Sequence, residues 1–588
     1  MFRKLLIANR GEIAIRVMRT AREMGIACVA VYSEVDRDAL HVRMADEAYL
    51  LGPAAPTQSY LDADRVLDVC GRSGVDAIHP GYGFLAENAA FARRVLDAGL
   101  GWIGPHADAI DAMGDKLRAR RAMQAANVPF VPGGTEAIEN VAEARVAAQR
   151  YGLPLALKAS GGGGGKGLKV ARTLDEIDSA FSTAKREAEA YFKDGTLYAE
   201  RYLENPKHVE LQIIADRHGT VLHVGERDCS LQRRHQKLWE EAPARIPQSV
   251  REGIREAGIR AANAIGYDSA GTIEFLVSED SFFFLEMNTR IQVEHTVSEM
   301  ISGLDLIREQ IRVAAGEPLA YTQDSIRFTG AAIEGRVNAE DPAHDFRPAP
   351  GEITAYREPG GPGVRLDSAA YPGLRISPDY DSLIAKLVVW APTRTQAIAR
   401  LRRAIDEFAI EGVPTTLPIL RALCDHPAVL DASYGTATLE NFAATWSGEP
   451  PFDSGLRPTL RVTPSAVTGT SAAVDVEVND RLYRVRFPGG AGTEPSLRRP
   501  PRVAKTGMLS ATTGGNDVVS PMHGVVVEMC VAPGDAIVEG QVVAVIEAMK
   551  MMNEIRAHRA GSVAAIHANA GATVEANAPL LTIEAPPA

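Results

Sequence analysis

The sequence predicts a multidomain α/β protein that ends in a small flattened β-barrel. Three observations lead to this prediction. The chain has 588 residues, enough for about three to five domains. Its opening segment alternates apolar strands with a helix, which is typical of a parallel α/β sheet. Near the C-terminus, residues 524–547 and 561–584 are two copies of one β-rich repeat, as expected for a barrel of two interlocked halves.

The composition excludes several classes of protein. The formal net charge is −12, from 63 Lys and Arg against 75 Asp and Glu, so we expect neither nucleic acid nor an anionic membrane as a partner. No apolar run approaches the roughly 18 residues of a membrane helix, and the run after Lys4 ends at Ala8, too early for a signal peptide. Scattered cysteines without a Cys-x-x-Cys spacing argue against disulfides or zinc and fit a reducing cytoplasm. They are Cys28, Cys70, Cys229, Cys424 and Cys530.

The N-terminal elements follow from hydrophobic periodicity. Strands are expected at Lys4–Ala8, Ala27–Tyr32, Ala77–His79 and Trp102–Gly104, and a helix from about Gly11 to Met24. The turn at residues 79–83 then lies at the carboxyl edge of the sheet, where open α/β sheets bind ligands. A plain turn is the alternative.

A glycine-rich segment, residues 160–167, separates two strand-like segments, Leu155–Lys158 and Leu168–Val170. We therefore interpret it as a hairpin loop and not as a flexible linker. It is not a dinucleotide fingerprint, because no helix follows, and Gly167 stands where a Walker A loop has Ser or Thr. A flap whose backbone amides close over phosphates beside Lys158 remains. This strand-loop-strand arrangement resembles the ATP-grasp fold.

Two carboxylates are predicted to face each other in a later hairpin. Strands expected at Thr272–Val277 and Phe282–Asn288, symmetric about residue 280, place Glu274 opposite Glu286. At about 5 Å and an effective dielectric near 20 the two charges repel by roughly 3 kcal/mol, so a cation should bridge them. A divalent metal with ATP is favoured over a solvated strand face.

Polar residues continue at every second position after Glu286. If the chain stays extended, they all lie on one face of the strand. They are Asn288, Arg290, Gln292 and Glu294. So many inward polar positions in succession have no explanation as a protein core, and they favour a binding site.

Lys550 lies on the turn between the two repeat copies, flanked by Met549 and Met551. Apolar side chains are unexpected at an exposed hairpin tip, which argues against a plain surface lysine. The segment resembles the biotinyl carrier domain of biotin-dependent carboxylases, in which this lysine is amidated by biotin. Lipoyl domains share the barrel and the lysine turn, and the flanking methionines favour biotin over lipoate.

Residues 1–446 resemble a biotin carboxylase, and residues 517–585 resemble its carrier domain. The matching segments are Lys4–Ile15, His79–Phe84, Lys158–Gly167, His208–Glu210, Glu226–Ser230, Gln232–Lys237, Glu286–His295 and Arg336–Asp341. The resemblance implies an N-terminal α/β domain at 1–115, an ATP-grasp domain at 116–330 with a lid at about 130–205, a C-terminal carboxylase domain at 331–446, a linker at 447–516 and the biotinyl domain at 517–585.

The resemblance also implies the roles of individual residues. The residues implied to contact ATP are Lys116, Lys158, Gly163, Gly164, Gly165, Glu200, His208, His235 and Lys237. Mg²⁺ or Mn²⁺ is implied at Glu274, Glu286 and Asn288, and bicarbonate at Lys237, Arg290, Gln292, Val293 and Glu294. Glu294 is implied as the general base that takes the bicarbonate proton as its oxygen attacks the γ-phosphate of ATP, giving carboxyphosphate. Arg336 would stabilise the biotin enolate, with Tyr82 also at biotin. Taken alone, His208 and His235 could be ordinary surface histidines.

Residues 448–516 are rich in Pro, Gly, Thr and Ser. Within them, apolar residues alternate at 474–478 and 483–487 around Asn479-Asp480, which predicts a hairpin. This small β element either docks a partner chain or is a spacer. As a random coil, the segment would span about 40 to 50 Å, enough for the carrier to travel between active sites.

No carboxyltransferase region follows the second repeat, so the resemblance implies a separate carboxyltransferase (β) subunit. The implied protein is the cytoplasmic α subunit of an acyl-CoA carboxylase, a ligase of fatty acid biosynthesis acting toward acetyl-CoA or propionyl-CoA. It would be biotinylated by a biotin protein ligase and form a homo-oligomer within a hetero-oligomeric complex. The alternatives are a pyruvate, methylcrotonyl-CoA or geranyl-CoA carboxylase subunit, or an ATP-grasp ligase with a lipoyl-type carrier.

Overall fold

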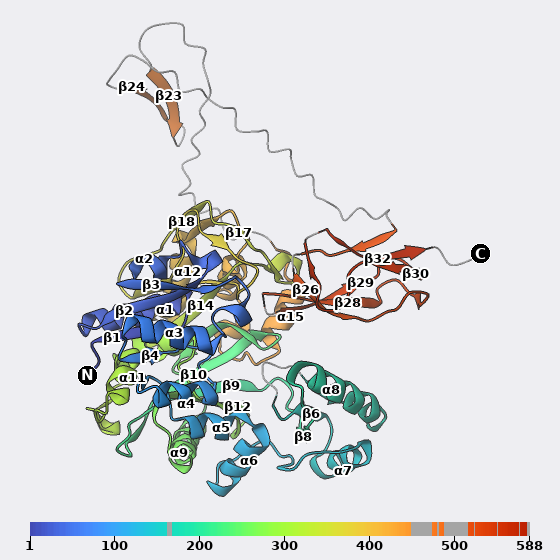
Figure 1. Ribbon diagram of the computed structural model, residues 1–588, viewed down its shortest axis with the longest axis horizontal. Coiled ribbons are helices and arrows are strands. Elements are labelled where there is room, and N and C mark those ends of the chain that lie inside the picture. Colours follow the sequence, from blue (N-terminus) through green and yellow to red (C-terminus); the bar gives the residue numbers. More distant parts are fainter. Residues whose placement is uncertain are drawn as a thin grey trace. The chain divides into compact units, whose positions relative to one another are not determined.

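The structure is a computed structural model that describes residues 1–161, 167–448, 473–478, 481–486, 516–522, 524–549, 551–575 and 577–584. The chain forms two compact units, Met1–Glu449 and Pro450–Ala588 (Figure 1). No helix among the described residues is both long and apolar enough to cross a membrane.

The chain opens with a five-stranded parallel sheet in the order β3-β2-β1-β4-β5. Alternation along β1 sends Leu5 and Ile7 into one hydrophobic cluster and Leu6 into another, so both faces of the sheet are covered. The predicted N-terminal strands and helix are confirmed to within two residues. The elements are β1 Lys4–Ile7, α1 Gly11–Glu23, β2 Ala27–Ser33, α2 Leu40–Met44, β3 Glu47–Gly52, α3 Ala63–Ser73, β4 Ala77–His79, α4 Ala89–Asp97, β5 Gly101–Trp102 and α5 Ala107–Gly114.

A three-stranded sheet in the order β7-β6-β8 follows, with α7 and α8 packed beside it (Figure 1). These elements share a small hydrophobic core of their own. Strands β6 and β7 pair antiparallel with Lys158 opposite Leu168, which confirms the predicted hairpin. Gly163, Gly164 and Gly165 lie outside the described residues. The elements are α6 Lys116–Ala125, α7 Val141–Tyr151, β6 Leu155–Ala159, β7 Leu168–Ala171, α8 Ile177–Phe192 and β8 Leu197–Arg201.

An eight-stranded antiparallel sheet in the order β13-β12-β9-β10-β11-β14-β21-β19 forms the centre of the first unit. Because β11 pairs with β14, this sheet runs without a break across the predicted domain boundary at residue 330. Its elements are β9 Lys207–Ala215, β10 Val221–Arg233, β11 Gln236–Ala242, α9 Gln248–Ala264, β12 Ser269–Ser278, β13 Ser281–Asn288, α10 His295–Ser302, α11 Leu306–Ala314, β14 Ala331–Asn338, β19 Val364–Ser368, β21 Leu383–Ala391 and α12 Arg394–Glu407.

Short elements complete the first unit. They are β15 Glu340–Asp341, β16 Arg347–Pro348, β17 Gly351–Glu352, β18 Ala355–Arg357, β20 Arg375–Ile376, β22 Ala409–Glu411, α13 Leu417–Leu423, α14 Pro427–Leu430 and α15 Thr438–Thr445.

The β12–β13 hairpin places Glu274 opposite Glu286, as predicted. The pairing near the turn differs from the symmetric hairpin that was expected. Symmetry about residue 280 would pair Ser278 with Phe282, but Ser278 pairs with Ser281, so the turn is one residue shorter. A bulge between the Glu274 and Phe275 pairs restores the register before it reaches the two carboxylates.

The second unit contains two four-stranded sheets in the orders β25-β32-β30-β27 and β29-β28-β26-β31. The first copy of the repeat forms β26, β27 and β28, and the second forms β30, β31 and β32, so each sheet includes a short strand from the other copy. One core joins both sheets. The elements are β25 Asp517–Val519, β26 Gly524–Met529, β27 Ala536–Ile537, β28 Val542–Ala548, β29 Met551–Arg556, β30 Gly561–Ile566, β31 Thr573–Val574 and β32 Pro579–Glu584.

The repeat symmetry predicted from sequence is close enough to constrain equivalent glycines in the same way. A Cβ atom at Gly524 would collide with the carbonyl oxygen of Glu547, and one at Gly561 with that of Glu584. The predicted hairpin within 448–516 is also confirmed, as β23 Ala473–Val478 paired with β24 Arg481–Arg486.

The turn between β28 and β29 corrects one expectation. Ala548 pairs with Met551, so the predicted hairpin is present. Met549 is only 4 % exposed and packs inward with a left-handed φ of 50°, so it is not the exposed apolar tip residue that the sequence predicted. Lys550 lies outside the described residues.

Candidate functional site

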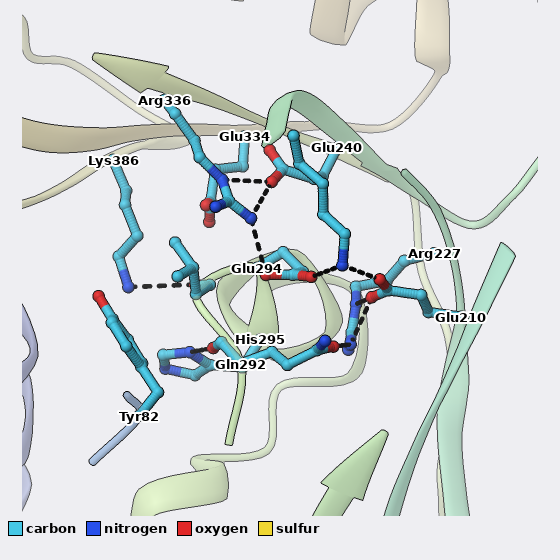
Figure 2. A network of polar contacts seen from close by, with 12 residues as sticks. Tyr82, Glu210, Arg227, Glu240, Gln292, Glu294, His295, Glu334, Arg336 and Lys386 are labelled. Atoms are coloured by element: carbon cyan, nitrogen blue, oxygen red, sulfur yellow. Dashed lines mark hydrogen bonds and ion pairs between the residues drawn. The ribbon is translucent and has the colours of Figure 1, made fainter. Parts of the chain in front are cut away.

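Glu294 occupies the centre of a buried network of charges at the N-terminus of α10 (Figure 2). It is 1 % exposed. Lys237 Nζ donates to Glu294 Oε1 at 2.6 Å, and Arg336 Nη2 donates to Oε2 at 2.9 Å. Burial opposes ionisation, but the two cations hold the pKa of Glu294 below its ordinary value. Glu294 is therefore an ionised carboxylate at neutral pH, available to accept a proton.

Lys237, on β11, is surrounded by carboxylates. Besides Glu294, its Nζ forms a short contact with Glu210 and lies 3.4 Å from Glu274 Oε1. Burial acts against the charge, but the three carboxylates together raise the pKa of Lys237 well above its ordinary value. The ammonium is thus a fixed positive charge, suited to an oxyanion such as bicarbonate or phosphate.

Glu274 gathers polar groups that the sequence placed on one face. Its Oε1 accepts from Asn288 Nδ2 at 2.8 Å and from Gln292 Nε2 at 2.9 Å. Arg290 Nη2 in turn donates to Asn288 Oδ1 at 2.9 Å. The predicted residues of this segment therefore meet in one cluster.

The expectation that the chain stays extended through residue 294 was wrong. Strand β13 ends at Asn288, and residues 289–294 form bends and a turn before α10. Glu87 explains the change of direction, because its carboxylate accepts from the backbone N–H of Thr289 at 3.1 Å and from Arg290 Nε at 2.8 Å. The turn still delivers Gln292 and Glu294 to the site.

The oxygen donors predicted for a divalent metal fit such an ion. Glu274 and Glu286 are direct partners on neighbouring strands, and Asn288 adds an amide next to Glu274. Carboxylate and amide oxygens are the ligands that Mg²⁺ and Mn²⁺ prefer. Each carboxylate also has a cationic partner within the protein: Lys116 Nζ lies 2.5 Å from Glu286, and His208 Nε2 lies 3.0 Å from Glu274.

A second convergent group consists of His208, Glu210 and Glu274. Burial disfavours a charged imidazole, but Glu274 and Glu210 raise the pKa of His208 to about 10. At neutral pH the imidazole is therefore protonated and pairs with the Glu274 carboxylate at 3.0 Å.

Two of the predicted nucleotide residues, Lys158 on β6 and Glu200 on β8, form a second patch. Glu200, 3 % exposed, forms a short ion pair with Lys158 and one of 2.5 Å with Arg120. Arg120 was not predicted, because it lies on α6, far from the glycine loop in sequence. His235 lies exposed at the tip of the β10–β11 hairpin, at a left-handed φ of 65°.

Tyr82 lies near a buried lysine, Lys386 (Figure 2). Lys386 Nζ donates to the Val293 carbonyl at 3.2 Å, and it lies 3.1 Å from Glu12 Oε2 and 5.9 Å from the centre of the Tyr82 ring. The Tyr82 hydroxyl forms a short hydrogen bond to Glu12. The turn after β4 thus reaches the site, as its place at the sheet edge predicted.

Arg227 was predicted only as part of the charged run Glu226-Arg227-Asp228, with no individual role at the site. It is fully buried and donates to Glu210 Oε2 at 2.9 Å and to Gln292 Oε1 at 3.0 Å. These contacts aim the Gln292 amide nitrogen toward Glu274. A signal existed: His208, Glu210 and Gln212 alternate along β9, which marks a polar inner face that needs a buried cation.

Family models match four stretches of the chain. Residues 1–110 match the N-terminal domain of biotin carboxylase, and residues 115–322 match the ATP-binding domain of the carbamoyl-phosphate synthase L chain. Residues 334–441 match the biotin carboxylase C-terminal domain, and residues 516–583 match the biotin-requiring enzyme model.

Curated relatives are similar over most of the chain. The biotin-dependent acyl-coenzyme A carboxylase alpha3 subunit of Mycobacterium leprae is 44% identical over 584 residues, which covers 97% of each chain. Biotin carboxylase 1 of Bacillus subtilis is 51% identical over 445 residues, covering 75% of this chain and 99% of its own. One pyruvate carboxylase subunit, from Methanothermobacter thermautotrophicus, is 52% identical over 429 residues, covering 73% of this chain and 87% of its own.

Solved structures show the same fold over the first unit. Biotin carboxylase of Campylobacter jejuni, in a complex with a β,γ-ATP ligand, has a TM-score of 0.73 at 45% identity and covers 75% of this chain and 99% of its own. The biotin carboxylase domain dimer of Hydrogenobacter thermophilus 2-oxoglutarate carboxylase, in complex with MgADP, ADP and bicarbonate, has a TM-score of 0.73 at 48% identity. It covers 75% of this chain and 98% of its own.

Proposed function

Because this chain belongs to the biotin carboxylase family and joins an ATP-dependent biotin carboxylase to a biotin carrier domain, we propose that Glu294, Lys237, Arg290 and Arg336 carry the reaction. The observation that supports this proposal is the position of Glu294. It is a buried, ionised carboxylate held by one cation on each oxygen. A base in this position can accept a proton as an anionic substrate takes over its cations.

Bicarbonate binds beside Glu294 in the proposed mechanism. Lys237 and Arg290 hold its oxygens, and the Gln292 amide fixes its orientation. Glu294 takes the proton from the bicarbonate hydroxyl as that oxygen attacks the γ-phosphate of ATP. One O–P bond forms to give carboxyphosphate, and the bond between the γ-phosphorus and the bridging oxygen breaks to release ADP.

The charge on the phosphates is offset from two directions. Lys116 and Lys158 supply cations that are already paired with Glu286 and Glu200, so each can exchange a carboxylate for a phosphate oxygen. Glu274, Glu286 and Asn288 would hold Mg²⁺ or Mn²⁺, which neutralises charge on the transferring phosphoryl group when bound.

Biotin attached at Lys550 would supply the ureido nitrogen that accepts the carboxyl group, as this nitrogen loses its proton and the C–O bond of carboxyphosphate breaks to release phosphate. Arg336 offers the fork of N–H donors that suits an oxyanion at this site. Tyr82, held by Glu12, lines the approach beside it. The β28–β29 hairpin fits a modification turn, because its strands pair up to Ala548 and Met551 on either side of the turn.

The proposal also covers the partners of this chain and the final acceptor of the carboxyl group. A biotin protein ligase modifies Lys550, and a separate carboxyltransferase (β) subunit in the cytoplasm passes the carboxyl group to acetyl-CoA or propionyl-CoA. The Mycobacterium leprae relative, an acyl-CoA carboxylase subunit that covers both units of this chain, supports this acceptor. The pyruvate carboxylase relative is 52% identical over 73% of this chain, so pyruvate is the second candidate.

Two substitutions test the separate roles of Glu294 as the base and Lys550 as the biotin attachment site. Glu294→Gln should lower bicarbonate-dependent ATP cleavage by about 10²-fold or more, because an amide cannot accept the proton, while the intact mass still shows biotin on Lys550. Lys550→Arg should lose biotinylation and keep carboxylation of free biotin. Near-normal turnover of Glu294→Gln would refute Glu294 as the base, and biotinylation surviving in Lys550→Arg would place the carrier site elsewhere.

A further inference from the structure

Arg336 is shared between two carboxylates from different elements (Figure 2). Its Nη2 donates to Glu294 Oε2 at 2.9 Å, and its Nε donates to Glu240 Oε1 at 2.5 Å. Glu240 lies on β11 and Arg336 on the neighbouring β14. The Arg336 guanidinium is therefore shared between Glu294, the proposed base, and Glu240, which takes no part in the proposed reaction.

A third carboxylate, Glu334, lies beside this pair. It is the direct partner of Glu240 in the register of β11 and β14, two residues before Arg336 on the same strand. Both glutamates are fully buried, and Glu334 accepts a short hydrogen bond from Thr296. Glu240 Oε2 and Glu334 Oε1 are buried without a hydrogen-bond partner among the described residues.

Two opposed buried carboxylates do not both ionise readily. Burial raises the pKa of Glu240 to about 7, against the attraction of Arg336, and raises that of Glu334 well above its ordinary value. The charged groups that face the two acids are Glu294, Arg336, Lys237 and Lys386. As the pH rises through about 7, Glu240 therefore ionises, and its negative charge is one cause of the raised pKa of Glu334.

We infer that Glu240, supported by Glu334, is a positioning residue that divides Arg336 between itself and Glu294 and so sets the strength of Glu294 as a base. This inference rests on the proposed role of Glu294. A neutral Glu240 leaves the Arg336 charge to Glu294, which weakens the base. An ionised Glu240 draws that charge away, which strengthens Glu294 and speeds removal of the bicarbonate proton.

The sign of the pH dependence follows from this division. The kcat of bicarbonate-dependent ATP cleavage should rise between about pH 6 and 8, as Glu240 loses its proton. In Glu240→Gln the amide keeps the size of the side chain but never ionises. We expect this variant to lack the rise and to stay about three- to tenfold below the wild-type plateau, with the KM for ATP unchanged.

Matched variants separate this role from a general loss of structure. Glu334→Gln mimics the protonated acid, so it should keep the rise near pH 7. Glu241→Gln removes the next carboxylate on β11, which pairs with Arg394 instead, and should also keep the wild-type profile. Glu240→Asp keeps an ionisable group that reaches Arg336 less well, so its rise should persist with a smaller amplitude, which provides a test even if Glu240→Gln fails to fold.

The measurement uses the full-length biotinylated protein with MgATP and bicarbonate over this pH range. A rise in Glu240→Gln equal to that of the wild type, a full wild-type amplitude in Glu240→Asp, or a wild-type profile without an ionisation near pH 7 would overturn the inference. Absence of bicarbonate-dependent ATP cleavage in the wild type at every pH would instead overturn the proposed function.

Discussion

At the scale of single residues, the site is a set of buried charges that neutralise one another until substrates arrive. Lys237 and Arg336 hold Glu294, and His208 holds Glu274. Buried ion pairs cost desolvation free energy, so they are weak evidence of stabilisation. These ion pairs instead hold charged side chains in fixed positions, where they can interact with the charges of the substrates.

The pKa of His208 gives the first prediction at this scale. A pKa of about 10 in the folded protein, against about 6.5 in the unfolded chain, means that the protonated imidazole stabilises the fold below about pH 6.5. This contribution is lost as the pH rises through about 10. We expect His208→Gln to cost about 1.5–3 kcal/mol near pH 6, with a smaller cost at higher pH.

The measurement is the thermal midpoint of the ligand-free protein across that pH range. His218→Gln is the control, because His218 is exposed and its imidazole contacts the Gly316 carbonyl oxygen instead of a carboxylate. A difference between wild type and His208→Gln that stays constant up to pH 10 would contradict the assigned pKa.

The site residues show what a sequence can reveal at this scale. Glu274, Glu286 and Asn288 could be placed by alternation, because their contacts are local to one hairpin. Arg227, Glu240 and Glu334 could not. Arg227 also contacts Thr272, Gln292 and Ser298, which are 45 to 71 residues away in sequence. Glu240 is followed directly by Glu241, which hides any alternation of polar with apolar residues.

At the scale of elements, local hydrophobic patterns predicted the strands well, and their long-range pairing was not predictable. The β6–β7 and β12–β13 hairpins are nearest neighbours in sequence. The β11–β14 pair instead joins residues about ninety positions apart, and it is the pair that brings Glu240 to Arg336. The bulge in the β12–β13 hairpin shows a further limit, since two deviations from ideal hairpin geometry cancel before the carboxylates.

Helix α9 provides a prediction about packing. It lies against β9 through Gly258, where an added Cβ would overlap the Leu211 side chain. We expect Gly258→Ala to destabilise the first unit by about 1–3 kcal/mol, because the core has no room for the methyl group. Gly71→Ala in α3 is the matched control, since nothing lies within 4 Å of its added Cβ.

The control should raise stability by about 0.5–1 kcal/mol, because alanine loses less conformational entropy than glycine in a helix. Thermal unfolding of the two variants beside the wild type measures both effects. Equal midpoints for Gly258→Ala and Gly71→Ala would show that α9 can move away from β9 at no cost.

At the scale of the whole molecule, the chain divides into two compact units. The core of the carrier unit consists entirely of residues between 518 and 583. We therefore predict that a fragment of residues 516–588 folds without the carboxylase unit and is biotinylated by a biotin protein ligase. Its dispersed NMR spectrum and cooperative thermal unfolding would confirm this independence, whereas a collapsed spectrum would show that the carrier needs the rest of the chain.

The exchange of short strands between the two repeat copies has a consequence for the history of the carrier. Strand β27 of the first copy completes the sheet of the second, and β31 of the second completes the sheet of the first. A single copy would leave both sheets unfinished, with open edges that invite pairing. Two identical half-length chains could close the same barrel as a two-fold symmetric dimer. Duplication and fusion of a gene for such a half-barrel would then place a single lysine turn on one continuous chain, at the junction of the ancestral subunits.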